Sequence, residues 1–147
     1  MIDPVVRCTV GAQPTVVVAA VTTWSAFPAV WRPMLDEVWG CLRAAGIARG
    51  CPNVMLYVDD RPQVEVGVST AAEAQLSGRV ARSALPAGSV ATARHHGPYQ
   101  DLGLAHDAVR GWCVEQGIQP AGPRWEIYGP HRDDPAELTV DVAYLLA

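Results

Sequence analysis

An acidic residue interrupts an aromatic and apolar stretch near the carboxyl end of the sequence. Glu126 lies between Trp125 and Ile127 in the run 122–130. Because side chains alternate across a β-strand, we expect Trp125 on one face and Glu126 with Tyr128 on the other. A carboxylate that faces apolar groups loses much of its hydration energy unless it is paired. Glu126 can therefore take up a proton, bind an internal donor, or bind a cationic ligand.

Two interpretations of Glu126 stay open at this point. In the first, a lipophilic cation neutralises Glu126 and stacks on nearby aromatic rings, each contact contributing about 0.5–2 kcal/mol. In the second, Glu126 points to solvent or pairs with Arg124 or Arg94. Three tryptophans are candidates for a pocket, although plain packing explains them equally well. Trp24 and Trp31 flank the start of the first predicted helix, and Trp125 adjoins Glu126.

The sequence predicts neither a metal site nor a cofactor site. His95 and His96 precede a Gly-Pro turn, but His106 and His131 show no ligand spacing with them. One histidine of the adjacent pair must face inward if the strand extends that far. The four cysteines form no Cys-x-x-Cys motif, and no glycine-rich phosphate loop or Gly-x-Ser-x-Gly motif is present.

Composition excludes several classes of function. The chain has 147 residues, a net charge of −4 and scattered arginines, whereas nucleic-acid binding needs a clustered positive face. The longest apolar run is too short to span a bilayer, and no secretory leader is evident. We therefore expect a cytoplasmic protein with reduced thiols that binds neither nucleic acid nor membranes.

The order of predicted elements occurs twice along the chain. Each half reads strand, strand, helix, strand, strand, and Gly46-Ile47 and Tyr57 in the first half correspond to Gly117-Ile118 and Tyr128 in the second. The predicted helices are 30–45 and 100–115; the predicted strands are 5–10, 15–22, 54–58, 64–68, 79–85, 89–94, 124–128 and 138–144. We expect one α+β domain over 1–147, a duplicated β-β-α-β-β fold with pseudo-repeats of about 1–74 and 75–147. Antiparallel strands would be covered by one helix per half, with a groove between the halves as the ligand site.

Two segments carry a resemblance to a known family. The stretch 89–99, which reads Ser-Val-Ala-Thr-Ala-Arg-His-His-Gly-Pro-Tyr, is followed by a helix and then by Gly-Pro-Arg-Trp-Glu-Ile-Tyr at 122–128. This order resembles the GyrI-like effector-binding family, which includes the ligand-binding parts of AraC- and MerR-type multidrug-responsive regulators. The resemblance covers essentially the whole chain. It implies two SHS2-like modules and a buried carboxylate at Glu126, with Met55 and Tyr57 as the first-half counterparts of Glu126 and Tyr128.

The resemblance implies small-molecule binding as the leading function. The ligand would be a lipophilic, cationic or aromatic molecule. One alternative is a hydrolase that opens the cyclopropane of DNA-alkylating natural products, with Glu126 activating water and Tyr57 or Tyr128 donating a proton. A second is a protein-partner inhibitor of the kind that binds DNA gyrase, and a homodimer also stays open. No DNA-binding helix-turn-helix is expected, because the first strand begins almost at residue 1. The expected ligand-lining residues are Glu126, Tyr128, Tyr57, Met55, Trp24, Trp31, Trp125, His96 and Tyr99.

Overall fold

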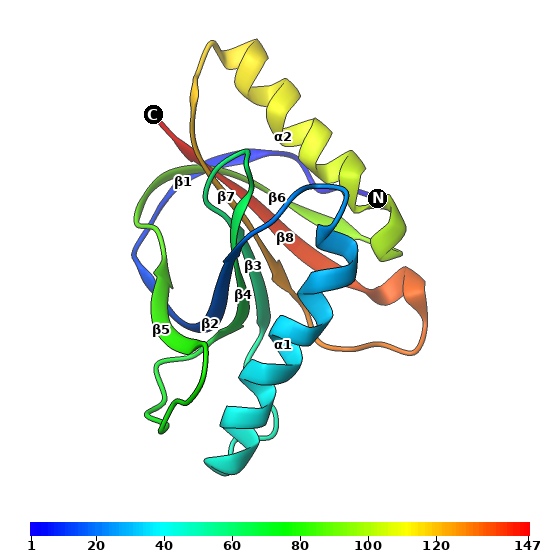
Figure 1. The fold of residues 1–147 in the computed structure, drawn as a ribbon. Coiled ribbons are helices and arrows are strands. Elements are labelled where there is room, and N and C mark those ends of the chain that lie inside the picture. Colours follow the sequence, from blue (N-terminus) through cyan, green and yellow to red (C-terminus); the bar gives the residue numbers. More distant parts are fainter. The chain divides into compact units, whose positions relative to one another are not determined.

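A computed structural model describes residues 1–147, which form two compact units. Unit 1 comprises Met1–Gly11 and Pro86–Ala147, and unit 2 comprises Ala12–Leu85. Each unit contains four antiparallel strands and one long helix (Figure 1). The predicted α+β class and the duplicated β-β-α-β-β order are confirmed.

Unit 2 is a four-stranded sheet covered by helix α1 (Phe27–Ala44). Its strands are β2 (Gln13–Val21), β3 (Asn53–Tyr57), β4 (Gln63–Ser69) and β5 (Val80–Leu85), and they lie in the order β3-β4-β2-β5. Val16 and Val18 of β2 stand opposite Val68 and Val66 of β4, so these valines share one face of the sheet. The buried side of α1 carries Met34, Val38 and Leu42 at helical spacing.

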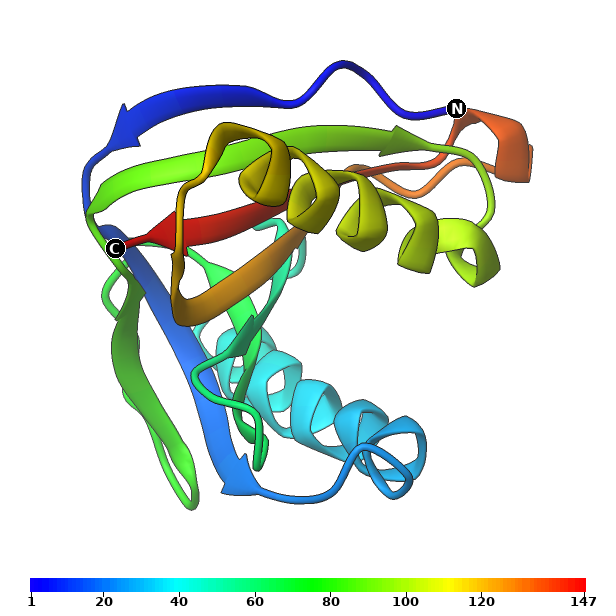
Figure 2. The ribbon, with the colours of Figure 1, turned by 90° about the horizontal axis from the view of Figure 1, so that it is seen from above.

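Unit 1 repeats this architecture with helix α2 (Leu102–Gln116), which follows a short 3-10 turn at Tyr99–Asp101. Its strands are β1 (Val6–Val10), β6 (Gly88–His96), β7 (Pro120–Tyr128) and β8 (Thr139–Leu146), in the order β1-β6-β8-β7. A second 3-10 turn, Pro135–Glu137, precedes β8. Helix α2 lies along β6 and β8 (Figure 2). The core beneath it contains Ala105, Val109 and Cys113 of α2 with Val140 and Val142 of β8.

The outer strand of each sheet comes from the other half of the sequence. β1, from the beginning of the chain, pairs with β6 in unit 1, whereas β5, from the middle, pairs with β2 in unit 2. Only two residues separate β1 from β2, and only two separate β5 from β6. Each short connection therefore passes from one unit to the other, and the two repeats exchange their first strands.

The two helices end in the same way. The amide of Ile47 donates to the carbonyl of Leu42 at 2.8 Å, and the amide of Ile118 donates to that of Cys113 at 3.0 Å. The residue before each isoleucine is a glycine in the left-handed region, with φ of 84° at Gly46 and 65° at Gly117. Glycine adopts this conformation without steric cost, which explains why both helices stop where the sequence predicts.

Helix α1 begins three residues before its predicted start. The hydroxyl of Thr23 accepts a hydrogen bond from the Ala26 amide at 3.1 Å, and the Thr23 carbonyl accepts one from the Phe27 amide at 2.9 Å. These bonds form a turn directly before Phe27, and Pro28 is compatible with the first turn of a helix because an amide hydrogen there has no helical partner. Pro33 consequently lies inside the helix and not near its start.

Candidate functional site

Strand β7 places Glu126 on the face of the unit 1 sheet that α2 covers. Glu126 stands opposite Val142, and Tyr128 stands opposite Val140, both of which belong to the core under the helix. The strand period thus directs Glu126 and Tyr128 to the same side, as predicted, and Trp125 to the other. Glu126 is only 4% exposed, so its carboxylate is removed from bulk water.

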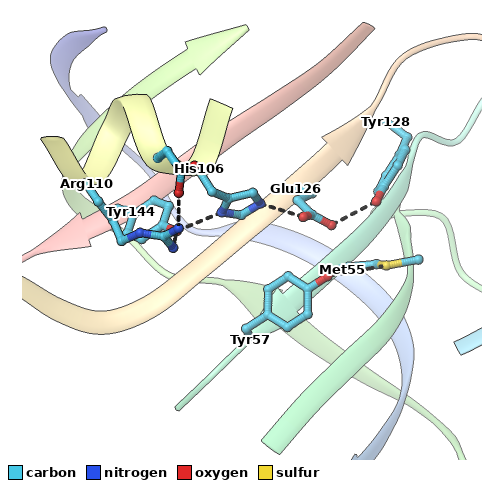
Figure 3. Close-up of polar contacts among 8 residues, drawn as sticks. Met55, Tyr57, His106, Arg110, Glu126, Tyr128 and Tyr144 are labelled. Atoms are coloured by element: carbon cyan, nitrogen blue, oxygen red, sulfur yellow. Dashed lines mark hydrogen bonds and ion pairs between the residues drawn. The ribbon is translucent and has the colours of Figure 1, made fainter. Parts of the chain in front are cut away.

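Both carboxylate oxygens of Glu126 contact hydrogen-bond donors (Figure 3). The Tyr128 hydroxyl donates to Oε1 at 2.8 Å, and Nε2 of His106 lies 2.7 Å from Oε2. A carboxylate only accepts hydrogen bonds, so Nε2 of His106 must carry a hydrogen. These two donors stabilise the ionised carboxylate against the loss of hydration that burial imposes.

The hydrogen bonds continue beyond His106 to Tyr144 and Arg110. Nδ1 of His106 lies 2.7 Å from the Tyr144 hydroxyl, which accepts a hydrogen bond from Nη1 of Arg110 at 2.8 Å. Nη2 of Arg110 in turn donates to Asp107 at 2.7 Å. We call Glu126, Tyr128, His106, Tyr144 and Arg110 the Glu126 network; Figure 3 shows them as a row along the sheet.

Tyr144 sets the direction of the hydrogen bonds in this network. Burial raises the pKa of Tyr144, an effect that the neighbouring guanidinium groups of Arg110 and Arg124 partly oppose. The side chain therefore keeps its single hydroxyl proton at neutral pH. Its oxygen accepts from Arg110, so the hydroxyl proton is available to Nδ1 of His106, which matches an imidazole tautomer with its hydrogen on Nε2.

An aromatic ring connects Tyr128 to the molecular surface of unit 1. The edge of Tyr99 packs on Tyr128 with ring centroids 5.5 Å apart and planes inclined by 79°. Tyr99 is 45% exposed, whereas Glu126 next to Tyr128 is buried. Two tyrosine rings thus lie near a buried carboxylate, and organic cations are attracted both to anionic groups and to the faces of aromatic rings.

Unit 2 carries the same arrangement with a different central residue. Met55 stands opposite Val66 and Tyr57 opposite Val64 in the register of β3 with β4, which matches Glu126 and Tyr128 in β7 with β8. The Tyr57 hydroxyl donates to the Met55 sulfur at 3.8 Å. Phe27 packs edge-on against Tyr57 at 5.6 Å, as Tyr99 does against Tyr128.

Trp24 extends this second aromatic cluster. Its ring centroid lies 5.5 Å from that of Tyr57, and 46% of the residue is exposed. A thioether at the position of Met55 is soft and polarisable and packs well against aromatic rings. The cluster of Trp24, Phe27, Met55 and Tyr57 is therefore suited to apolar and aromatic groups, whereas the Glu126 network carries the charge.

Three of the predicted ligand-lining residues lie outside these two clusters. His95 pairs with Val140 in the register of β6 with β8, so His96 projects to the face of the sheet away from Glu126. Nε2 of His96 lies 3.0 Å from the Asp3 carboxylate. Trp125 also lies on that opposite face and is buried. Trp31 lies in α1, where the Arg32 guanidinium is 5.8 Å from its ring centroid.

The sequence analysis missed His106, Tyr144 and Arg110. A signal for His106 was nevertheless present, because it falls at helical spacing among the buried residues Leu102, Ala105, Val109 and Cys113. A histidine on the apolar stripe of a helix needs a polar partner in the core. We considered His106 only as a metal ligand, and the structure contains no cluster of three or more His, Cys, Asp or Glu residues suited to a metal ion.

Three further features bear on the class of protein. All four cysteines are unpaired. Neither helix is long and apolar enough to cross a membrane. The chain matches the GyrI-like small molecule binding domain over residues 5–145, and we conclude that it belongs to this family. No curated protein sequence matches it.

Several solved structures share the fold. EcmrR, in a complex with DNA, superposes with a TM-score of 0.75 at 17% identity over 97% of this chain and 56% of EcmrR, so the chain spans little more than half of that protein. The EcmrR C-terminal domain alone gives a TM-score of 0.74 at 18% identity, with 97% and 96% of the two chains covered. SAV2435 bound to tetraphenylphosphonium superposes with a TM-score of 0.64 at 7% identity, with 97% of this chain and 93% of SAV2435 covered. A hydrolase from Listeria innocua superposes with a TM-score of 0.61 at 10% identity, with 98% of this chain and 92% of the hydrolase covered.

Proposed function

We propose that this protein binds lipophilic organic cations, with Glu126 as the counter-charge and Tyr128 and Tyr99 as aromatic contacts. The observation that carries the proposal is a carboxylate that is 4% exposed and lies against tyrosine rings. Within unit 2, the proposal assigns contacts with apolar and aromatic groups to Met55, Tyr57 and Trp24. It also includes the expected cytoplasmic location.

Electrostatics favours a cation at this position over a neutral ligand of the same shape. Two unit charges 4 Å apart attract each other by about 4 kcal/mol at an effective dielectric constant of 20. Each aromatic face over a cation contributes about 0.5–2 kcal/mol more, and the contribution grows as water is excluded. A diffuse cation such as a tetraarylphosphonium loses little hydration on burial, so most of this attraction contributes to affinity. The binding of tetraphenylphosphonium to SAV2435, which has the same fold, supports this class of ligand.

A binding experiment with two ligands of similar shape tests the proposal. Tetraphenylphosphonium supplies the cation and triphenylphosphine oxide the neutral analogue, with affinities measured by titration calorimetry and tryptophan fluorescence. We expect Glu126→Gln to weaken tetraphenylphosphonium binding at least tenfold, equivalent to about 1.4 kcal/mol, and to leave the neutral analogue almost unchanged.

Glu115→Gln is the matched control for this experiment. It removes the same charge from an exposed position on α2, so it reports the effect of net charge alone. Equal affinities of the two variants for tetraphenylphosphonium would show that Glu126 is not the counter-charge, and the proposal would then be wrong.

A hydrolase is the second candidate, and one specific contact favours it. The Glu126 carboxylate and the Tyr128 hydroxyl lie 2.8 Å apart, so a base and an acid are adjacent. In such a reaction, water would attack a strained cyclopropane carbon, Glu126 would accept a proton from that water, and Tyr128 or Tyr57 would protonate the phenolate that leaves. The fold shared with a Listeria innocua hydrolase is consistent with this candidate.

Product analysis distinguishes the two candidates. A cyclopropane-bearing spirocyclic dienone incubated with the protein would gain the mass of one water if the protein is a hydrolase. Glu126→Gln would then abolish the product while substrate binding persists. A ligand recovered unchanged from a saturable complex would instead support binding alone.

A further inference from the structure

The Glu126 network contains a titratable group that the proposed function does not use. Nε2 of His106 contacts the carboxylate at 2.7 Å, and the His106 side chain is only 14% exposed. We propose that His106 is a specificity-determining residue: the site accepts a permanent cation while this imidazole is neutral and releases it when the imidazole takes up a proton. This inference rests on the proposed function and names how the same site is regulated.

The neutral form of His106 fits the hydrogen bonds on both sides of its ring. Nε2–H donates to Glu126, Nδ1 accepts from the Tyr144 hydroxyl, and that hydroxyl accepts from Arg110. Each donor in this series points toward Glu126. The imidazole and the carboxylate together carry one negative charge, which is available to a bound cation.

A proton on Nδ1 changes both the hydrogen bonds and the charge. Nδ1–H would donate to the Tyr144 oxygen, which already accepts from Arg110, and the Tyr144 proton would have to turn away within a site where this residue is 3% exposed. The imidazolium would form a closed ion pair with Glu126 at 2.7 Å. The two groups together would be neutral, so a cationic ligand would lose its counter-charge.

The other charged and titratable groups around His106 affect the protonation of its imidazole in opposite directions. Asp107 and Arg110 on α2 are paired with each other, and Arg124 stands opposite Tyr144 on β7. Tyr128 on β7 and His95 on β6 share the sheet face toward α2. The two guanidinium groups disfavour an imidazolium, whereas Glu126 favours it. A bound ligand cation would also disfavour the imidazolium, as the guanidinium groups do, and His106 would release its proton on binding.

The consequence is an exchange of one proton for one cation. Imidazole side chains in proteins titrate between about pH 5 and 8. Over the pH range in which His106 is protonated, the affinity for a permanent cation would rise up to tenfold per pH unit, and above that range it would level off. The affinity for an uncharged analogue would stay constant, because it gains nothing from the released carboxylate.

Calorimetry on the intact chain measures this exchange directly. We would titrate tetraphenylphosphonium from pH 5.0 to 8.5 at constant ionic strength, in buffers with different heats of ionisation. The wild-type protein is expected to release up to one proton per ligand over the pH range in which its affinity changes, and to bind at least tenfold more tightly at pH 7.5 than at pH 5.5. Triphenylphosphine oxide should show neither effect.

His106→Gln is the decisive variant. A glutamine amide can donate to Glu126 and accept from Tyr144 but does not titrate in this range. We expect His106→Gln to bind tetraphenylphosphonium equally at pH 5.5 and 7.5, with no proton release. His131→Gln is the matched control, because His131 is 85% exposed and contacts only Asp133; this control should keep the wild-type pH dependence. An unchanged pH dependence in His106→Gln, or none in the wild type, would overturn the inference.

A spectroscopic titration of the wild-type protein provides a second test that needs no variant at His106. The chemical shift of the His106 imidazole, followed by NMR, should reach its midpoint at lower pH when tetraphenylphosphonium saturates the protein. An identical midpoint with and without ligand would overturn the inference. The two proposals fail separately: loss of the Glu126→Gln effect contradicts the proposed function, whereas binding through Glu126 without proton release contradicts only the role of His106.

Discussion

Glu126 and Met55 occupy equivalent positions in the two units, and each stands opposite a valine of the neighbouring strand. Each is followed two positions later by a tyrosine whose hydroxyl donates to it, and each tyrosine is packed edge-on by an aromatic ring. The difference between them is one of charge and hydration. A carboxylate in this position needs donors, which His106 of α2 and Tyr128 of β7 provide, whereas a thioether needs none.

The Tyr128 hydroxyl should contribute measurably to stability. Tyr128→Phe leaves Oε1 of the buried Glu126 without this donor, and hydrogen bonds to charged groups contribute about 1.5–3 kcal/mol. We expect the free energy of unfolding in urea to fall by about 2 kcal/mol. Tyr99→Phe is the control, since it keeps the ring contact and removes only the hydroxyl of a half-exposed residue; a similar loss in both variants would contradict this account.

Residue-level prediction succeeded where a local period decides the outcome. Glu126 and Tyr128 are two positions apart in one strand, so their common face follows from the sequence. The contact between Glu126 and His106 joins residues 20 positions apart and depends on how α2 lies on the sheet of unit 1. No local pattern encodes that geometry, although the position of His106 on the apolar stripe indicates that it faces the core.

At the scale of single elements, two glycines should respond in opposite ways to the same substitution. A Cβ at Gly67 in β4 would collide with the backbone carbonyl of Val16 on β2, whereas one at Gly40 on α1 meets no atom within 4 Å. Gly67→Ala is expected to destabilise the protein by roughly 1–3 kcal/mol. Gly40→Ala should stabilise it by roughly 0.5–1 kcal/mol, because alanine favours the helix. Thermal unfolding measures both, and a loss of stability in Gly40→Ala would contradict this reading of α1.

The turn between β3 and β4 should depend on pH through Asp59. Its carboxylate accepts hydrogen bonds from the Gln63 amide at 2.8 Å and from Arg61, and these bonds lower the pKa of Asp59. A carboxyl whose pKa is lowered by folding stabilises the protein above its unfolded pKa and loses this effect as pH falls through the folded value. Asp59→Ala should therefore lower the melting temperature at pH 7.

The difference between wild type and Asp59→Ala should shrink below about pH 4, where the free carboxyl is largely protonated. Asp133→Ala is the control, because it removes the same charge from a fully exposed side chain near His131. A difference between wild type and Asp59→Ala that stays constant from pH 7 to pH 3 would exclude the carboxylate as its cause.

Element types and the ends of both helices could be predicted well from the sequence, but the starts of α1 and β7 could not. Both helix ends were located by glycine and the alternating strand β4 by its valines, because these signals are local. The start of α1 was misplaced, since the hydrogen bonds that Thr23 accepts from the Ala26 and Phe27 amides outweigh the preference that Pro33 gives for a first turn. Strand β7 begins earlier than predicted because an irregularity between Pro120 and Arg124 lets it pair with β8 over a longer distance.

At the scale of the whole molecule, the exchange of β1 and β5 determines which fragments can fold. Residues 12–85 include all four strands of unit 2 and α1, whereas residues 1–74 lack β5 and residues 75–147 lack β1. We expect the fragment 12–85 to unfold cooperatively in circular dichroism and the fragment 1–74 to be much less stable. Mixing 1–74 with 75–147 should restore the sheets of both units. A fragment 1–74 that melts as cooperatively as 12–85 would show that β5 is dispensable.

The exchanged strands also bear on the origin of the chain. One half expressed as a separate gene product would complete its sheet only by taking a strand from a second copy, as in a domain-swapped homodimer. Every such homodimer would carry the same residue at the positions of Glu126 and Met55. Gene duplication and fusion remove that constraint, since each copy then mutates alone. Duplication thus allows one position to become acidic in one copy and apolar in the other, and the covalent link keeps the two different copies in the same molecule.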